Sequence, residues 1–384
     1  MIVPDPIVNL RAPRTIPVAK PSLGEAEARA AYEAVRSGWI SQGPLVERFE
    51  REFAACHGKR YGVCCNSGTT ALHLALKAAE VGPGDEVVLP ALTMVACANA
   101  VLYCGAVPRF VDSEPATGNA DPARLNGAIG PRTKAVIVPH LYGVPAMDFL
   151  NAARALAPRA TIIEDCAECH YAAAGGRPVG SFGRFATFSF YANKIVASGE
   201  GGMVLTDCDR TARRLGSLRS HAFSPETHFC HEELAFGMRY TDLQAAVALV
   251  QHERRQELLG RRETIARRYL ARFEGQPALE FPARTPGAAW WVFPLLASDG
   301  AARDRLRGRL AEAGVETRSY FIPLHRQQHL RPYATGEYPV ADSLSARGLY
   351  LPLWPDMTDE DVDYVAEVIV RGARRAAAPG EPEA

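Results

Sequence analysis

The chain is expected to adopt an α/β fold, with a mostly parallel sheet flanked by helices in a large domain and a smaller C-terminal α+β domain. Between residues 61 and 206, short continuous apolar segments alternate with stretches of helical periodicity, which is typical of a parallel sheet covered on both faces. The 384 residues exceed the usual size of a single domain, so two domains are expected. A hydrophobic content of 47% is enough to build their cores.

The N-terminal part precedes the alternating region. Residues 1–20 are rich in proline and lack a clear period, so we expect an arm that lies on the surface or on a partner. Residues 24–36 and 45–56 have helical spacing; in the second segment Val46, Phe49 and Phe53 recur on one face. The glycines and the proline between them predict a loop over 37–44.

The alternating region supplies the sheet of the large domain. Its apolar segments predict strands at 61–65, 86–90, 107–112, 133–138, 160–165, 184–191 and 203–206. The intervening segments predict helices at 68–80, 93–103, 121–129 and 147–156.

The C-terminal part is expected to begin within one long helix from Asp242 to about Tyr269. Strands at 288–296 and 317–321 and helices at 302–313 and 359–374 then predict the smaller α+β unit. The predicted organisation is therefore an arm over 1–20, a large domain over 21–255, a small domain over 256–374 and a flexible tail over 375–384.

Composition excludes several classes of protein. The 43 basic and 43 acidic residues give no net charge and hence no electrostatic footprint for nucleic acid. No apolar run reaches the length of a membrane span, and Pro4, Asp5 and Pro6 interrupt any signal peptide. The nine cysteines, scattered through apolar segments, indicate reduced thiols in a cytoplasmic protein. Cys166 and Cys169 have CxxC spacing but no second pair, so we interpret them as packing residues and expect no metal site.

Three polar clusters follow the ends of predicted strands. Ligands bind at the carboxyl ends of parallel strands, so these clusters predict one cleft. Residues 66–70, Asn-Ser-Gly-Thr-Thr, open a helix whose free N–H groups suit a phosphate. Asp165 ends a buried strand, where a carboxylate needs a cationic partner such as a protonated pyridine nitrogen. Lys194 lies between an aromatic run and a glycine-rich turn, a setting that suits a Schiff-base lysine.

Each of these clusters has an ordinary alternative when it is taken singly. The first could be a helix cap, Asp165 could form a cap or a salt bridge, and Lys194 could be a solvated turn residue. Glu164 alternates to the opposite face from Asp165, so the two are not expected to act as a carboxylate pair. In combination and in this order, the clusters fit pyridoxal 5′-phosphate.

The sequence resembles a known family, the DegT/StrS sugar aminotransferases, which are a branch of the fold-type I pyridoxal-phosphate enzymes. The similarity extends from about Ile16 to Ile369. The segments that carry it are 37–43, 66–69, 82–87, 140–143, 164–168, 180–183, 189–194, 199–202, 238–245 and 351–353.

The resemblance implies roles for individual residues. Lys194 would form the Schiff base with the cofactor and Asp165 would pair with its ring nitrogen, which makes these two the expected catalytic residues. Gly68, Thr69 and Ser189 would hold the phosphate, and Glu168 would lie near the ring hydroxyl. The expected substrate-pocket residues are Trp39, Ser41, His221, Arg239 and His325. For the two histidines, ordinary surface or capping use is the alternative.

Two positions depart from the family pattern. Met94 stands where the family usually stacks an aromatic residue on the cofactor ring, and a thioether can pack there instead. Gly237 stands where the family usually offers an asparagine from the partner subunit to the phosphate, so that donor is lost unless a backbone N–H or Arg239 replaces it. The family is dimeric, and the segment 236–240 normally reaches into the neighbouring active site, so a homodimer with shared active sites is expected.

The implied activity is transfer of an amino group from an amino acid, expected to be glutamate, to a keto sugar that is most often nucleotide-linked. Lys194 would be the general base in both half-reactions, which predicts ping-pong kinetics. A keto-cyclitol or another antibiotic or glycan precursor is an alternative substrate. A dehydratase of the same fold is a further alternative, but that branch carries histidine in place of the Schiff-base lysine, so Lys194 argues against it. A non-catalytic regulator is another alternative, and the complete set of Lys194, Asp165 and Ser189 argues against it.

Overall fold

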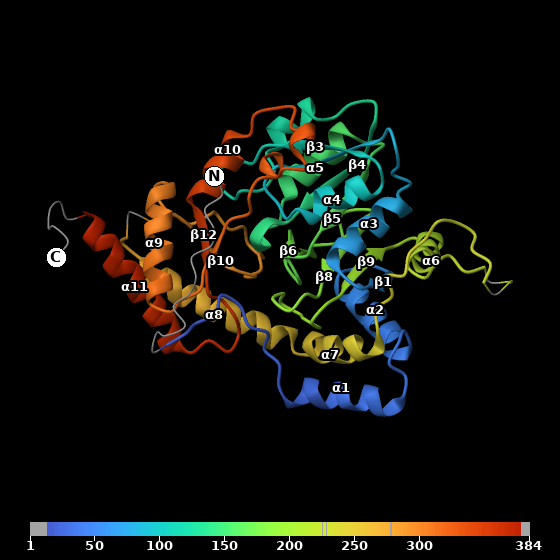
Figure 1. Cartoon of the computed structure of the whole chain (residues 1–384), viewed down its shortest axis with the longest axis horizontal. Coiled ribbons are helices and arrows are strands. Elements are labelled where there is room, and N and C mark those ends of the chain that lie inside the picture. Colours follow the sequence, from blue (N-terminus) through green and yellow to red (C-terminus); the bar gives the residue numbers. More distant parts are fainter. Residues whose placement is uncertain (1–13, 225, 228, 277–278, 378–384) are drawn as a thin grey trace.

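A computed structural model of the chain describes residues 14–224, 226–227, 229–276 and 279–377 (Figure 1). The first thirteen residues of the predicted arm and the last seven of the predicted tail lie outside the described residues. The large sheet has the strand order β1-β9-β8-β5-β4-β2-β3. Its strands are β1 (Tyr61–Cys65), β2 (Glu86–Pro90), β3 (Val107–Val111), β4 (Thr133–Pro139), β5 (Thr161–Asp165), β8 (Phe185–Ser189) and β9 (Gly202–Thr206).

The expectation of a mostly parallel sheet is confirmed. β3, β2, β4, β5 and β8 are parallel neighbours, whereas β9 runs antiparallel to both β8 and β1. The reversal follows from the short connection after β8. Phe190 donates its N–H to the carbonyl of Gly201 over 2.8 Å and Ala192 to that of Gly199 over 3.0 Å, so the chain folds straight back on itself.

Helices cover both faces of this sheet, as the uninterrupted apolar strands indicate. Alternate residues of one strand enter different cores: Val136 and Val138 pack with Phe149 of α5, whereas Ile137 packs with Leu72 of α3. Figure 1 shows α1 lying against α7 and away from the sheet. The helices of this part are α1 (Glu25–Ser37), α2 (Pro44–Cys56), α3 (Gly68–Ala78), α4 (Ala96–Tyr103), α5 (Met147–Leu156), α6 (Asp209–Leu218) and α7 (Asp242–Glu253).

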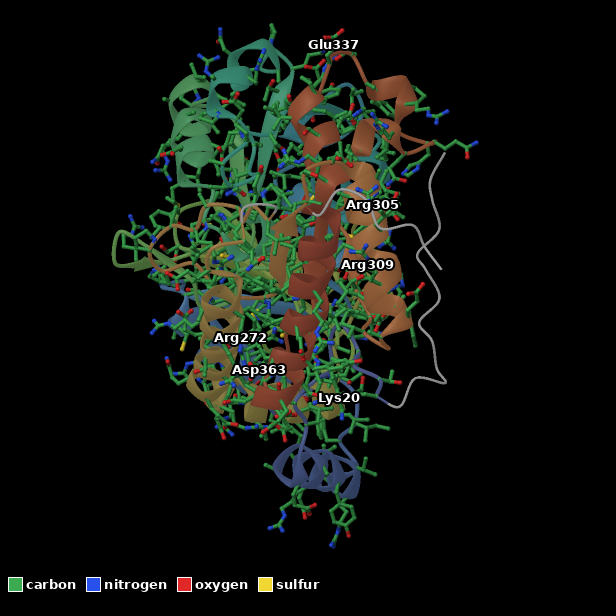
Figure 2. The ribbon with its side chains drawn as sticks, turned by 90° about the vertical axis from the view of Figure 1, so that its left-hand side faces the viewer. Lys20, Arg272, Arg305, Arg309, Glu337 and Asp363 are labelled. Carbon is green, nitrogen blue, oxygen red and sulfur yellow. The ribbon has the colours of Figure 1, made fainter. Side chains whose placement is uncertain are left out.

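A smaller sheet with the order β10-β12-β11 forms the centre of the C-terminal unit. Its strands are β10 (Phe293–Leu296), β11 (Arg318–Ser319) and β12 (Gly348–Leu351), and its helices are α8 (Arg255–Phe273), α9 (Gly300–Glu312) and α11 (Asp359–Ala377). Ile16, from the described part of the arm, is buried in the core of this unit. On its surface Asp363 of α11 accepts hydrogen bonds from Arg268 and Arg272 of α8, and Figure 2 shows Arg272 and Asp363 side by side.

The remaining short elements include two that bring the C-terminal part back to the large sheet. These are the segment around η3 (Leu324–Arg326) and helix α10 (Pro339–Arg347). Leu324 donates its N–H to the carbonyl of Ala91, directly after β2, over 2.7 Å. Asp112, directly after β3, accepts the N–H groups of Val340 and Ala341 at the start of α10. The other short elements are η1 (Pro122–Gly127), η2 (Leu141–Gly143), η4 (Arg331–Tyr333), β6 (Ala173–Ala174) and β7 (Arg177–Pro178).

Several predictions about single elements were wrong. The long helix expected from Asp242 is broken at Arg254, whose backbone leaves the helical region while its guanidinium is held by Glu27 and Glu257. The helix expected over 121–129 is a short 3-10 helix, because Asp121 and Pro122 start a tight turn. Helices α6 and α10 and strand β12 were not expected.

None of the helices within the described residues combines the length and the apolar character needed to cross a membrane.

Candidate active site

Lys194 lies in the tight loop after β8, where its N–H is hydrogen bonded to the carbonyl of Tyr191 over 2.9 Å. Its amine nitrogen lies over the ring of Trp291, 3.7 Å from the ring centroid. The amine has no hydrogen-bond or ion-pair partner among the described residues. Burial lowers the pKa of Lys194, and the charges of Glu168 and Asp165 oppose that shift. The amine is therefore able to exist in its neutral form, which a nucleophile or a base requires.

Asp165, the last residue of β5, is only 8% exposed. One carboxylate oxygen accepts the N–H of Ala167 over 3.1 Å, and the other accepts the thiol of Cys97 over 3.2 Å. Both donors are neutral, and no cationic group of the described residues is hydrogen bonded to this carboxylate. A buried carboxylate is costly without a positive partner, so this position fits a cationic atom of a ligand.

Glu168 is the third ionisable group of the cleft. One of its oxygens accepts the N–H of Tyr142 over 2.8 Å. Burial raises the pKa of Glu168 above its usual range, although the positive charge of Lys194 opposes the shift. Lys194, Asp165 and Glu168 thus interact electrostatically near the carboxyl ends of β5 and β8, the edge of the sheet at which the sequence predicts the first two.

The start of α3 forms the other end of the cleft. Ser67 caps the helix through the N–H of Thr70, so its hydroxyl is already in use, while the N–H groups of Gly68 and Thr69 have no hydrogen-bond partner among the described residues. An ideal Cβ on Gly68 would lie 2.7 Å from the Cβ of Ser189, so only glycine allows β8 to approach this closely. The Ser189 hydroxyl therefore lies beside two free N–H groups, which together suit a phosphate.

Glu164 faces away from Asp165, as its position in the strand predicts. Its two oxygens accept the N–H groups of Gly180, Phe182 and Gly183 and the Nε2–H of His140. The Nδ1 atom of His140 accepts the N–H of Ala146, which fixes the neutral tautomer. His140, Glu164 and Cys166 lie close enough to suggest a metal cluster, but the carboxylate is saturated with hydrogen bonds. This group holds the turn at residues 180–183 beside β5.

The cysteines are free, as their distribution suggests. Cys166 and Cys169 are both buried and not bonded to each other, and only Cys56, Cys208 and Cys230 are exposed. The CxxC pair therefore packs within the core.

The residues expected to line a substrate pocket are peripheral within a single chain. Trp39 is 58% exposed, and Ser41, His221 and Arg239 are also exposed. His325 differs, because its Nε2 is 3.0 Å from Asp342 and its ring stacks on Tyr338. Within the described residues, none of these five side chains is hydrogen bonded or ion paired to Lys194, Asp165 or Ser189.

The two departures from the family pattern have different surroundings. Met94 is 47% exposed and lies just before α4. At Gly237, an ideal Cβ would lie 2.9 Å from the Nε2 atom of His221, so the imidazole occupies the space that a side chain would need. His221 has a positive φ of 65°, which places its ring over this glycine.

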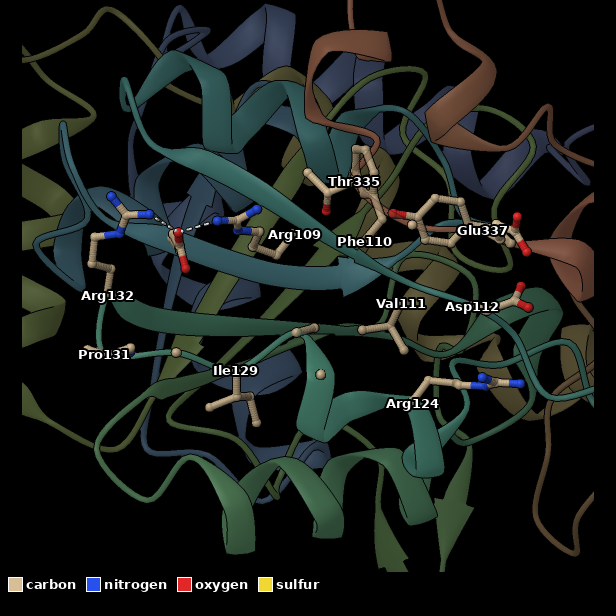
Figure 3. Close-up of a pocket in the computed structure, with 16 residues that line it drawn as sticks. Arg109, Phe110, Val111, Asp112, Arg124, Ile129, Pro131, Arg132, Thr335 and Glu337 are labelled. Atoms are coloured by element: carbon tan, nitrogen blue, oxygen red, sulfur yellow. Dashed lines mark hydrogen bonds and ion pairs between the residues drawn. The ribbon is translucent and has the colours of Figure 1, made fainter.

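Cavities elsewhere in the described chain lack this chemistry. Figure 3 shows one of about 450 Å³ along the edge strand β3, where Arg109 and Arg132 each lie 2.7 Å from the same oxygen of Glu86. Two of its three guanidinium groups thus share an acidic partner, and no lysine lines it. A smaller cavity of about 220 Å³ adjoins the cleft and is lined by Asn193, Trp291 and Arg318.

Sequence reasoning missed two residues of the cleft. Trp291 contacts Lys194 and donates its indole N–H to the carbonyl of Asn193 over 2.9 Å, yet it is almost 100 residues away along the chain. The only local signal is the Trp290–Trp291 pair in an otherwise small-residue segment. Cys97 was considered only as one of the reduced thiols in apolar segments, and nothing in its local sequence indicates its contact with Asp165.

Known proteins share this fold and sequence over nearly the whole chain. The model of the DegT/DnrJ/EryC1/StrS aminotransferase family matches residues 21–370. GDP-perosamine synthase of Caulobacter vibrioides is 39% identical over 358 residues, covering 91% of this chain and 96% of that protein. The spore coat polysaccharide biosynthesis protein SpsC of Bacillus subtilis is 37% identical over 382 residues, covering 93% and 98%. The crystal structure of the aminotransferase TlmJ from Streptoalloteichus hindustanus has a TM-score of 0.89 at 32% identity, covering 95% and 100%. The chain belongs to the DegT/DnrJ/EryC1/StrS aminotransferase family.

Proposed function

We propose that this protein is a pyridoxal 5′-phosphate-dependent aminotransferase that transfers an amino group from glutamate to the ketone of a nucleotide-linked sugar. The observation that carries the proposal is the amine of the half-buried Lys194, which has a pKa lowered by burial, has no hydrogen-bond partner among the described residues and lies near two carboxylates. The choice of a nucleotide-linked sugar is supported by relatives from two organisms that are named GDP-perosamine synthase.

The residues of the cleft fit the cofactor. Lys194 would carry it, and Asp165, which has no cationic partner among the described residues, would meet its ring nitrogen. The phosphate would lie at Gly68, Thr69 and Ser189, where the close approach of β8 leaves N–H and hydroxyl donors together. The remaining proposed contacts are Glu168 near the ring hydroxyl, Met94 against the ring face and Gly237 near the phosphate.

When bound, the cofactor supplies an electron sink for the electron pair left by a broken C–H bond next to the amino nitrogen. The protein supplies the proton transfers and the charge. A neutral Lys194 amine takes the proton from the substrate carbon and returns it, and burial favours that neutral form. The Asp165 carboxylate, fixed by its two hydrogen bonds, keeps a proton on the ring nitrogen and thereby strengthens the sink.

The same residues serve both half-reactions, so the keto acid leaves before the keto sugar reacts and the kinetics are ping-pong. The proposed substrate contacts are Trp39, Ser41, His221, Arg239 and His325.

The active site is proposed to be completed by a second copy of the chain in a homodimer. In support, Trp39, Met94 and Tyr191 are large apolar residues that are about half exposed in the single chain. We place the enzyme in the cytoplasm, on the ground that all nine cysteines are free.

Borohydride reduction of the cofactor-loaded protein, followed by peptide mass spectrometry, tests the attachment. The reduced label is expected on the peptide that contains Lys194. Lys194→Ala is expected to lose transamination between glutamate and a GDP-linked keto sugar, whereas Lys134→Ala, a change on β4, serves as the lysine control. A label on another peptide, or a Lys194→Ala variant with near wild-type turnover, would refute the assignment.

A further inference from the structure

Cys97, near the start of α4, is the direct neighbour of Asp165. Its sulfur lies 3.2 Å from Oδ2 of the carboxylate, and neither side chain is open to bulk water, with Cys97 fully buried and Asp165 8% exposed. The hydroxyl of Thr93, four residues earlier and before the start of α4, lies 3.7 Å from the same sulfur. These three side chains form a short polar row.

The direction of the hydrogen bonds in this row follows from the chemistry of the groups. An ionised carboxylate can only accept, so the thiol must donate to Asp165. The Thr93 hydroxyl is then available to donate to the sulfur. Burial, together with the negative charge of Asp165, raises the pKa of the Cys97 thiol well above its usual range. The thiol therefore remains protonated and remains a donor throughout the range in which the enzyme works.

On the basis of the proposed function, we propose that Cys97 is a positioning residue for Asp165. Its S–H holds Oδ2 while the N–H of Ala167 holds Oδ1, so the plane of the carboxylate is fixed from both sides. The remaining lone pairs are left for the protonated ring nitrogen of the cofactor. The residue does not touch substrate, and it acts only through Asp165.

The choice of sulfur has an electronic consequence. A thiol is a weaker donor than a hydroxyl, so it orients the carboxylate while withdrawing little of its negative charge. Asp165 then remains a strong acceptor for the ring nitrogen. A serine would orient the carboxylate equally well but withdraw more charge, which would allow the ring nitrogen to lose its proton at lower pH. An alanine would leave Oδ2 without its donor and free to rotate.

Cys104 provides a matched control on the same helix. It is the C-terminal cap of α4, seven residues after Cys97, is 7% exposed, and its thiol has no hydrogen-bond partner among the described residues. Replacing it changes a buried thiol at the other end of α4 without touching Asp165. Effects that reflect only the packing of α4 should therefore appear in both sets of variants.

The first test needs no cofactor. The infrared S–H stretch moves to lower frequency when a thiol donates a hydrogen bond. In the full-length apoprotein, each cysteine-to-serine variant removes the S–H band of the replaced thiol and so identifies it. The band of Cys97 is expected at lower frequency than the band of Cys104, and Asp165→Ala is expected to shift only the band of Cys97. Equal frequencies, or a Cys97 band that Asp165→Ala leaves in place, would overturn the assignment of the hydrogen bond.

The second test measures cofactor binding and the pH dependence of the absorption spectrum. Cys97→Ala is expected to raise the dissociation constant for pyridoxal phosphate about 5- to 10-fold, the usual effect of losing one hydrogen bond. Cys97→Ser is expected to stay within about 2-fold and to move the absorbance transition of the ring nitrogen to lower pH. Cys104→Ala should change neither quantity. Equal behaviour of Cys97→Ala and Cys104→Ala would reduce Cys97 to a packing residue.

The positioning role of Cys97 and the proposed function of the protein can be refuted separately. If borohydride labels Lys194 but the Cys97 variants bind cofactor and titrate like the wild type, the positioning role is wrong and the proposed function stands. If no label reaches Lys194, the proposed function is wrong, whatever the infrared bands show. Should Cys97→Ala not fold, Cys97→Ser and Cys97→Thr, which keep the volume and a donor, carry the same comparison through the pH transition.

Discussion

Replacing Gly68 by alanine tests the contact between α3 and β8. The added Cβ would lie 2.7 Å from the Cβ of Ser189 and 3.1 Å from its hydroxyl oxygen. Carbon atoms in contact are ordinarily about 3.5–4.0 Å apart, so the two elements must separate by up to about 1 Å. The separation would move the Ser189 hydroxyl away from the N–H groups of Gly68 and Thr69, and three donors would no longer converge on one phosphate.

The expected cost falls on cofactor binding more than on folding. Losing one hydrogen bond to a charged phosphate costs about 1.5–3 kcal/mol, which corresponds to a dissociation constant roughly 10- to 100-fold higher. Alanine is favoured over glycine in a helix by about 1 kcal/mol, so this gain offsets part of the strain in the apoprotein. We therefore expect the free energy of unfolding of the apoprotein to change by less than about 1 kcal/mol.

The assay is titration of the apoprotein with pyridoxal phosphate, followed by quenching of tryptophan fluorescence, because Trp291 lies beside Lys194. Gly308→Ala, in α9, is the matched control, since no atom lies within 4 Å of its added Cβ. It should leave the dissociation constant unchanged and stabilise the protein by up to about 1 kcal/mol. If Gly68→Ala binds cofactor as tightly as the control does, the proposed phosphate site is wrong.

Three further variants test other parts of the molecule. Glu164→Gln should destabilise the fold by about 2–3 kcal/mol in chemical denaturation at pH 7, because it leaves buried donors unpaired. Burial alone would raise the pKa of Glu164, but the hydrogen bonds from His140 and the backbone outweigh burial, so its pKa is below the usual value. The stabilisation by Glu164 is therefore complete above about pH 5 and is lost as the pH falls, and this acid-dependent loss of unfolding free energy should be missing in the variant. Met94→Tyr should lower the dissociation constant for pyridoxal phosphate by about 3-fold in the tryptophan-fluorescence titration, since an aromatic ring stacks on the cofactor ring better than a thioether does. An unchanged dissociation constant would show that residue 94 does not face the ring. Asp363→Asn should lower the unfolding free energy by at most about 1 kcal/mol, because the ion pairs of Asp363 with Arg268 and Arg272 are partly exposed. The difference in unfolding free energy between variant and wild type should shrink in high salt, and a difference that is insensitive to salt would contradict a role of these ion pairs.

Local signals were sufficient for the central sheet and for the residues at its edge. The strands of the large sheet are short, continuous apolar segments, and the carboxyl ends of the parallel ones coincide, so the sequence predicts Asp165 and Lys194 at one edge of the sheet. The opposite orientation of Glu164 followed from the alternation of side chains along a strand.

The elements that were missed lack local start signals. Helix α10 begins with a proline, and the N–H groups of its first turn are accepted by Asp112, more than 200 residues earlier in the chain. Helix α6 has no side-chain cap at all. The break between α7 and α8 at Arg254 depends on Glu27 of α1, which the sequence does not place beside it. The start of α10 and the break between α7 and α8 therefore depend on contacts between segments that are far apart in the sequence.

The sequence by itself determined the α/β class, the family and the order of the groups along the cleft, because periodicity and strand ends are properties of short segments. Only the tertiary structure decided which side chains surround those groups. Trp291 over Lys194 and Cys97 beside Asp165 come from separate elements, and their distances depend on how helices and strands pack. Packing is a long-range outcome, since a side chain meets its partner only after every intervening element has found its place.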